Sequence, residues 1–203
     1  MKQKIKFVYF DIGGVILKFR DQFEKLEQKH KIDGKKASKV WLDHLPDLCL
    51  GKKNTSQVWS DICEKTDSKH LADIDWQIFR AENLSIYEDT HELITSLVKK
   101  RIGVGLLSNA ELGMINICIS HKLIPEAKYV AVVDSSVLGY KKPDQKIFEF
   151  AQSLISYAKN EVLFIDDTER NIAAAKEFGW QVFNFDENNP KKSVSEIRAL
   201  LQI

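Results

Sequence analysis

Asp11 stands at the end of an apolar run close to the N-terminus and is soon followed by Gly13 and Gly14. The preceding residues, 6–10, are predicted to form a buried strand of a parallel sheet. Ligands of open α/β sheets bind outside the carboxyl ends of the strands, so a carboxylate at this position can take part in chemistry. The two glycines allow a tight turn and a close approach of a ligand to the main chain. The alternative is a solvated aspartate before an ordinary glycine turn.

Polar side chains also follow two later apolar runs, and a loop containing lysine lies between those runs in the sequence. The carboxyl ends of parallel strands project from the same edge of a sheet, so we expect these groups to meet Asp11 there. The groups concerned are Ser108 and Asn109 after the run 102–107, Lys142 in the loop 139–144, and Asp166 and Asp167 after the run 162–165.

Such a set of side chains suits the transfer of a phosphoryl group. Three carboxylates raise one another's pKa unless a cation neutralises them, and Mg²⁺ prefers hard oxygen ligands with room for water. The hydroxyl of Ser108 and the ammonium group of Lys142 would hold a dianionic phosphoryl group from other sides. A carboxylate that faces the phosphorus atom is a feasible nucleophile. The five histidines have no motif spacing and do not compete for this site.

The elements that must position these groups alternate between apolar runs and helical patterns from residue 87 onward. This alternation predicts right-handed crossovers and a mostly parallel sheet between helices, an α/β fold of the Rossmann-like three-layer type. The expected strands are 6–10, 102–107, 129–133, 162–165 and 181–185, and the expected helices are 90–100, 112–119, 147–157, 171–178 and 194–201.

Between the first strand and this alternating part, the sequence from about residue 21 to residue 83 shows helical periodicity and no convincing strand alternation. It predicts an inserted helical segment. Trp41, Trp59 and Trp76 occupy helical positions in it and are expected to pack in its core rather than against a substrate.

Composition limits the other possibilities. The 30 basic and 29 acidic residues nearly cancel, so the charge favours neither nucleic acid nor an anionic membrane as a partner. No apolar run is long enough to span a bilayer, and residues 1–5 lead straight into a strand rather than a signal peptide. Cys49, Cys63 and Cys118 are odd in number and widely spaced, which is typical of reduced, packed thiols. We therefore expect a cytoplasmic protein, and the sequence indicates no oligomeric state.

The four segments resemble, in order, the four signature motifs of the haloacid dehalogenase-like (HAD) hydrolase superfamily. The resemblance implies that Asp11 is the nucleophile, that Ser108 donates to phosphoryl oxygens and that Lys142 neutralises the phosphoryl group. The four segments are 11–15, 106–109, 139–144 and 165–167. The Mg²⁺ ligands that it implies are Asp11, the main-chain carbonyl of Gly13, Asp167 directly and Asp166 partly through water.

The helical insertion resembles the cap of this superfamily, which lies over the active site. The resemblance covers nearly the whole chain and implies a core domain of residues 1–18 and 85–203 and a cap domain of residues 19–84. Motion of the cap would control access to the site.

Three further polar residues have two interpretations each. Asn109 could bind the substrate or cap the helix that follows it. Asp144 and Asn171 could orient Lys142 and the metal ligands, or could equally cap helices.

Gly13 departs from the pattern of the superfamily's phosphatases, which carry there a second aspartate that protonates the leaving group. General acid–base catalysis is worth about 10²–10⁴-fold, so its loss matters. The main interpretation is a Mg²⁺-dependent phosphatase that acts on a small phosphorylated metabolite through an aspartyl-phosphate, with a good leaving group or a substitute acid. The alternatives are other chemistry on this fold, such as that of dehalogenases and phosphonatases, or a phosphate-binding regulatory protein without turnover.

Overall fold

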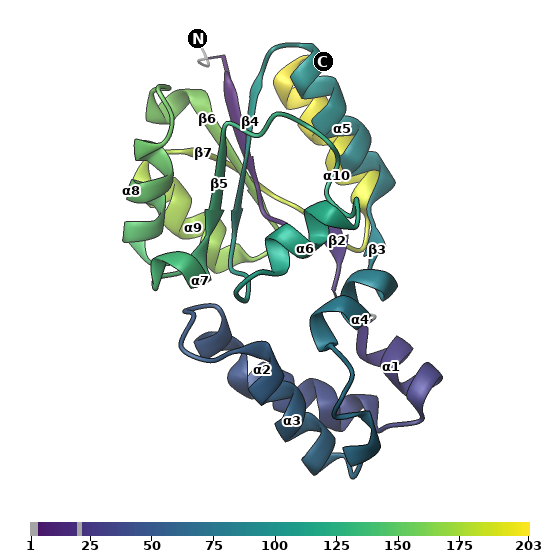
Figure 1. Cartoon of the computed structure of the whole chain (residues 1–203). Helices are drawn as coiled ribbons and strands as arrows, with labels where there is room; N and C mark the ends of the chain where they lie inside the picture. The colour runs from purple at the N-terminus through teal and green to yellow at the C-terminus, as the bar shows by residue number, and fades with distance from the viewer. Residues whose placement is uncertain (1–3, 20–21) are drawn as a thin grey trace.

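The computed structural model describes residues 4–19 and 22–203, and at its centre is a five-stranded sheet. All neighbouring strands are parallel, in the order β5-β4-β1-β6-β7, and helices cover both faces (Figure 1). The expected α/β fold with a mostly parallel sheet is therefore confirmed. The strands are β1 (Phe7–Phe10), β4 (Gly103–Ser108), β5 (Ala131–Asp134), β6 (Val162–Asp166) and β7 (Gln181–Asn184).

The helices fall into two groups that Figure 1 separates, one around the sheet and one beyond its carboxyl edge. Those around the sheet are α5 (Glu88–Lys99), α6 (Met114–Ser120), α7 (Ser135–Leu138), α8 (Gln145–Ser153), α9 (Glu169–Phe178) and α10 (Pro190–Leu201), with the 3₁₀ turn η2 (Lys159–Glu161). Those beyond the edge are α1 (Gln22–His30), α2 (Gly34–Leu48), α3 (Thr55–Lys65) and α4 (Trp76–Asn83), with the 3₁₀ turn η1 (Lys69–Leu71).

The central strand β1 is buried on both faces, as a continuous apolar run in a parallel sheet should be. Val8 and Phe10 belong to the apolar core beneath α5, α6 and α10, whereas Phe7 and Tyr9 belong to the core beneath α8 and α9. All four side chains are inaccessible to solvent. This burial fixes the strand in the middle of the sheet, so that Asp11 emerges at the centre of its carboxyl edge.

The helical group α1–α4 has an apolar core of its own, built around tryptophans. The rings of Trp59 and Trp76 stack at 4.9 Å with an interplanar angle of 3°, and the ring of Trp41 meets Trp76 edge-on at 5.9 Å. All three side chains are buried in this core, as expected, and Trp41 also lines the cavity described below.

Two short strands not predicted from the sequence join the two groups. β2 (Leu17–Lys18) and β3 (Ser85–Ile86) pair antiparallel where the chain enters and leaves the helical group. A strand of two residues carries too little periodicity for a sequence pattern to reveal it.

The division into a core of residues 1–18 and 85–203 and a cap of residues 19–84 remains a prediction. Residues 1–3 and 20–21, which include the expected start of the insertion and part of the N-terminal lead, lie outside the described residues. The three cysteines are buried free thiols, as expected. Within the described ranges, no helix is long and apolar enough to cross a membrane.

Candidate active site

Three carboxylates meet at the carboxyl edge of the sheet. Asp11 directly follows β1, Asp166 is the last residue of β6, and Asp167 comes next in the chain. Because β1 and β6 are parallel neighbours, their ends lie side by side, and one oxygen of each carboxylate lies within 4.8 Å of the others. The structure thus brings together the three acidic residues predicted from the sequence.

Lys142 is the cation within this group. Its ammonium nitrogen lies 3.0 Å from Oδ2 of Asp11 and 2.6 Å from Oδ2 of Asp166, and it donates a hydrogen bond of 2.9 Å to the carbonyl of Leu107. The side chain of Lys142 is 1% exposed. We call Asp11, Lys142, Asp166 and Asp167 the sheet-edge cluster.

Burial and like charges raise the pKa values of two of these acids. The pKa of Asp11 rises to about 7, chiefly because the carboxyl is buried; Lys142 opposes the shift, and Asp166 and Asp167 add to it. Burial also raises the pKa of Asp167, and the charge of Asp166 acts in the same direction. Burial alone would lower the pKa of Lys142, but its two carboxylate partners outweigh burial and raise it. The three carboxylates of the sheet-edge cluster therefore carry more negative charge than the ammonium group of Lys142 neutralises.

Asp166 is the most fully bonded acid of the cluster. Besides Lys142, it accepts hydrogen bonds from the backbone N–H of Thr168 at 2.8 Å and from the amide of Asn171 at 3.1 and 3.2 Å. Of the two interpretations of Asn171, its contact with Asp166 agrees with the one in which it orients an acidic residue. The side chain of Asp144, in contrast, caps α8 by accepting from the N–H of Lys146.

The carboxylate of Asp167 occupies the space in which a side chain at Gly14 would lie. The φ of Gly14 is +74°, and a Cβ at this position would lie 2.3 Å from Oδ2 of Asp167. Any side chain here would therefore be strained and would displace the carboxylate.

Asn109 holds the main chain of Lys142. Its side-chain oxygen accepts from the N–H of Lys142 at 2.8 Å, and its side-chain nitrogen donates to the Lys142 carbonyl at 3.0 Å. The helix-capping interpretation of Asn109 is wrong, because α6 begins after Gly113 without a side-chain cap. Asn109 also lines the cavity described next, and its contact with a substrate stays a prediction.

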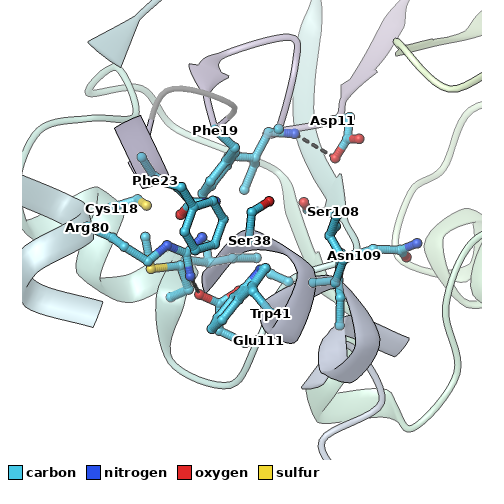
Figure 2. Close-up of a pocket in the computed structure, with 18 residues that line it drawn as sticks. Asp11, Phe19, Phe23, Ser38, Trp41, Arg80, Ser108, Asn109, Glu111 and Cys118 are labelled. Carbon is cyan, nitrogen blue, oxygen red and sulfur yellow. Dashed lines mark hydrogen bonds and ion pairs between the residues drawn. The ribbon is translucent and has the colours of Figure 1, made fainter. Parts of the chain in front are cut away.

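A cavity of about 540 Å³ extends from Asp11 to residues of α1, α2 and α4 (Figure 2). Asp11, Ser108 and Asn109 lie at one end of this cavity, and aromatic rings lie beside them. Most of its remaining wall is apolar and comes from the helical insertion and from α6. These apolar side chains are Phe23, Trp41, Leu42, Leu45, Met114 and Ile115.

Phe19 lies against Gly13, at the position where the superfamily's phosphatases carry their second aspartate. A Cβ on Gly13 would lie 3.1 Å from ring carbon Cδ2 and 3.5 Å from Cε2 of Phe19, the first closer than an ordinary contact. Phe19 follows β2 outside every motif, so no spacing in the sequence indicates its role.

A buried ion pair completes the wall of the cavity. The guanidinium of Arg80, from α4, is bonded to the carboxylate of Glu111, which follows β4, and both side chains are buried. The guanidinium also lies 4.7 Å from the ring centroid of Trp41 and 5.1 Å from that of Phe19. Sequence reasoning missed both residues, because they are 31 positions apart and belong to no motif.

Comparison with known proteins agrees with this geometry. The sequence matches the profile of haloacid dehalogenase-like hydrolases over residues 5–179. It is 26% identical over 88% of the chain to a D-ribitol-5-phosphate phosphatase of Bacteroides thetaiotaomicron, of which 91% is covered.

Two solved structures have the same fold at low identity. A HAD family enzyme of B. thetaiotaomicron, in complex with magnesium and inorganic phosphate, superposes with a TM-score of 0.69 at 20% identity, covering 90% of this chain and 95% of that one. The L-2-haloacid dehalogenase of Xanthobacter autotrophicus superposes with a TM-score of 0.68 at 18% identity, covering 97% of this chain and 88% of that one.

The fold and the sequence match together define a hydrolase with a parallel α/β core. The chain belongs to the haloacid dehalogenase-like hydrolase family, as the four motifs indicate.

Proposed function

We propose that this chain is a Mg²⁺-dependent phosphatase that acts on a small phosphorylated metabolite through an aspartyl-phosphate on Asp11. The observation that carries the proposal is the sheet-edge cluster, in which three carboxylates lie together, the buried Lys142 pairs with two of them, and Asp11 stands at the head of a cavity. The phosphatase activity of the ribitol-5-phosphate relative and the magnesium and phosphate bound in a protein of the same fold support it.

Each residue of the chain has a definite role in this proposal. A carboxylate oxygen of Asp11 attacks the phosphorus atom in line, and the bond between phosphorus and the leaving oxygen breaks. Lys142 and the hydroxyl of Ser108 stabilise the charge on the phosphoryl oxygens. Water then attacks the aspartyl-phosphate, which releases inorganic phosphate and restores the carboxylate of Asp11.

The donor set fits a divalent cation. Hard carboxylate oxygens lie within 4.8 Å of one another, and their charge exceeds that of Lys142. Mg²⁺ bound there supplies positive charge beside the phosphoryl group. The proposed ligands are Asp11, the carbonyl of Gly13, Asp166 and Asp167. The full bonding of Asp166 to Lys142, Thr168 and Asn171 favours Asp167 as the direct ligand and Asp166 as a ligand partly through water.

The helical insertion, as a cap over the cavity, would exclude bulk water during the transfer and admit it afterwards. Besides the ion pair of Arg80 and Glu111, hydrogen bonds join it to the rest of the chain. The side chain of Gln77 donates to the carbonyl of Leu112, and the hydroxyl of Ser135 donates to the carbonyl of Cys49.

A hydrolytic dehalogenase is the second candidate, because Gly13 carries no acid and the cavity is mostly apolar. A halogenated carboxylic acid, however, needs a cation for its carboxylate. Among the described residues that line the cavity, Arg80 is the cation, and Glu111 already neutralises it. The phosphatase is therefore the better supported proposal.

The test is release of inorganic phosphate from acetyl phosphate and a panel of sugar phosphates, with and without Mg²⁺, alongside chloride release from 2-chloropropionate. We expect Mg²⁺-dependent phosphate release that is lost in Asp11→Asn and kept in Asp144→Asn. The control suits this purpose because Asp144 caps a helix outside the cluster and asparagine caps equally well. Chloride release without phosphate release would overturn the proposal in favour of a dehalogenase, and release of neither would favour a binding protein.

A further inference from the structure

We infer that the preferred substrate is the phosphate monoester of a neutral aromatic alcohol of the phenol type, whose ring occupies the apolar cavity beside Asp11. This inference rests on the proposed phosphatase function and narrows it to one class of leaving group. Three features of the cavity carry it: the absence of an acid at Gly13, the apolar wall and the neutralised arginine.

The first feature concerns the proton that a leaving oxygen needs. Gly13 has no side chain, and Phe19 fills the space above it, with a ring carbon 3.1 Å from where a Cβ would lie. Among the described residues lining the cavity, the other acid besides Asp11 is Glu111, and its carboxyl group is bonded to the guanidinium of Arg80. None of the described lining residues is therefore placed to act as a general acid for the leaving group. A phenol ionises near pH 10 and leaves readily as its anion. The anion of an aliphatic alcohol is far more basic, so its departure depends on protonation by an acid.

The second feature is the wall that a leaving group would touch. Most of the wall beyond Asp11, Ser108 and Asn109 consists of the rings of Phe19, Phe23 and Trp41 and of aliphatic side chains. The polar side chains in it are Gln22, Ser38 and the paired Arg80 and Glu111. Flat aromatic rings pack favourably on apolar side chains, and a volume of about 540 Å³ is ample for one ring. A polyol would instead have to leave most of its hydroxyl groups against apolar surface, which is unfavourable.

The third feature is the charge of the cavity. Arg80 is bonded to Glu111 and lies over the rings of Trp41 and Phe19. Its charge is therefore already matched, and a second anionic group on the substrate would have no free cation among the described lining residues. The leaving group that fits is neutral.

The proposed reaction consumes only the phosphate ester and water. An oxygen of Asp11 forms a bond to phosphorus as the bond from phosphorus to the aryl oxygen breaks, and the electron pair leaves with that oxygen. The phenolate then takes a proton from solvent. Water hydrolyses the aspartyl-phosphate to inorganic phosphate, which restores Asp11.

Four substrates test the first two features separately. Phenyl phosphate and benzyl phosphate both place a ring in the cavity but differ in the basicity of the leaving oxygen. Benzyl phosphate and ribitol 5-phosphate both lose an alcohol but differ in apolarity. Acetyl phosphate, which is small and needs no acid, reports on the phosphatase reaction alone.

We expect kcat/KM for phenyl phosphate to exceed that for benzyl phosphate by about 10²-fold or more, the scale of a missing general acid. We expect benzyl phosphate to exceed ribitol 5-phosphate by about tenfold, the scale of burying part of a ring. Hydrolysis of acetyl phosphate together with equal or faster hydrolysis of ribitol 5-phosphate would overturn the inference and leave the phosphatase proposal intact. Failure to hydrolyse acetyl phosphate would instead count against the phosphatase itself.

A pair of leucine variants tests whether the ring lies in this cavity. Leu42 lines the cavity and is 57% exposed, whereas Leu154 lies at the end of α8, away from it, and is 42% exposed. We expect Leu42→Ser to lower the ratio of kcat/KM for phenyl phosphate to that for acetyl phosphate by about threefold to tenfold. Leu154→Ser should keep the wild-type ratio, and thermal melts should show both variants folded. An unchanged ratio in Leu42→Ser would contradict the inference.

Discussion

The carboxyl edge of the sheet and the wall of the cavity above it are built in different ways. At the edge, charged groups from three separate segments form hydrogen bonds and ion pairs with one another, and Lys142 bonds to both Asp11 and Asp166. In the wall, apolar side chains from the insertion and from α6 enclose space, with a single ion pair among the described lining residues. In the proposed function, the edge carries out the reaction and the wall selects the substrate.

The largest expected effect tests the ion pairs that Lys142 forms at the carboxyl edge of the sheet. Lys142→Met would leave Asp11 and Asp166 buried without their cation, and breaking a buried pair in this way costs about 3–5 kcal/mol. Urea unfolding should show a loss of free energy of unfolding in that range. Lys141→Met, at the neighbouring half-buried position, should change it by less than about 1 kcal/mol. Equal losses in the two variants would mean that the buried pairs do not stabilise the fold.

Two glycines with the same backbone angle give the next test. Gly14 and Gly139 both have a φ of +74°, but a Cβ would collide with Asp167 only at Gly14 and would meet nothing within 4 Å at Gly139. Gly139→Ala should cost about 1–2 kcal/mol of stability from backbone strain alone. Gly14→Ala should cost more and should also weaken Mg²⁺ binding, measured by calorimetry. Equal Mg²⁺ affinity in the two variants would show that Asp167 does not need the space over Gly14.

The wall of the cavity meets the carboxyl edge of the sheet at Gly13. The ring of Phe19 lies there in the space that an aspartate side chain at position 13 would need. We expect Gly13→Asp alone to raise kcat/KM for benzyl phosphate by less than tenfold, because the new carboxyl must displace the ring. Gly13→Asp combined with Phe19→Ala should raise it by at least about tenfold over the single variant, within the range of general acid catalysis. Phe19→Ala alone, the control, should bring no gain. A single variant as active as the double would show that Phe19 does not obstruct the position.

The sequence predicts the carboxyl edge of the sheet better than it predicts the wall of the cavity. The strands, their parallel direction and the meeting of Asp11, Lys142, Asp166 and Asp167 follow from local periodicity and from the rule that strand ends share an edge. The contacts in the wall depend on how helices from distant segments pack. The pairing of Arg80 with Glu111 and the placement of Phe19 against Gly13 therefore have no signature in the sequence.

The smallest expected effect concerns pH and sharpens the description of the edge. The pKa of Asp11 is about 7 in the metal-free fold, above its value in the unfolded chain, so the folded state binds this proton more tightly. The metal-free protein should therefore gain stability from this group as the pH falls from 8 toward 5. Mg²⁺ must displace that proton, so its affinity should weaken as the pH falls from 8 to 6, by up to about tenfold per unit. An affinity independent of pH over this interval would contradict the raised pKa.

The most direct test of the central claim is to trap the covalent intermediate. The protein would be mixed with acetyl phosphate and Mg²⁺, quenched in acid during turnover and digested, and its peptides weighed by mass spectrometry. The proposed function predicts a phosphoryl group on Asp11 in the wild type and none in Asp11→Asn. Turnover with the phosphoryl group on another residue, or with no phosphorylated peptide and an active Asp11→Asn variant, would contradict it.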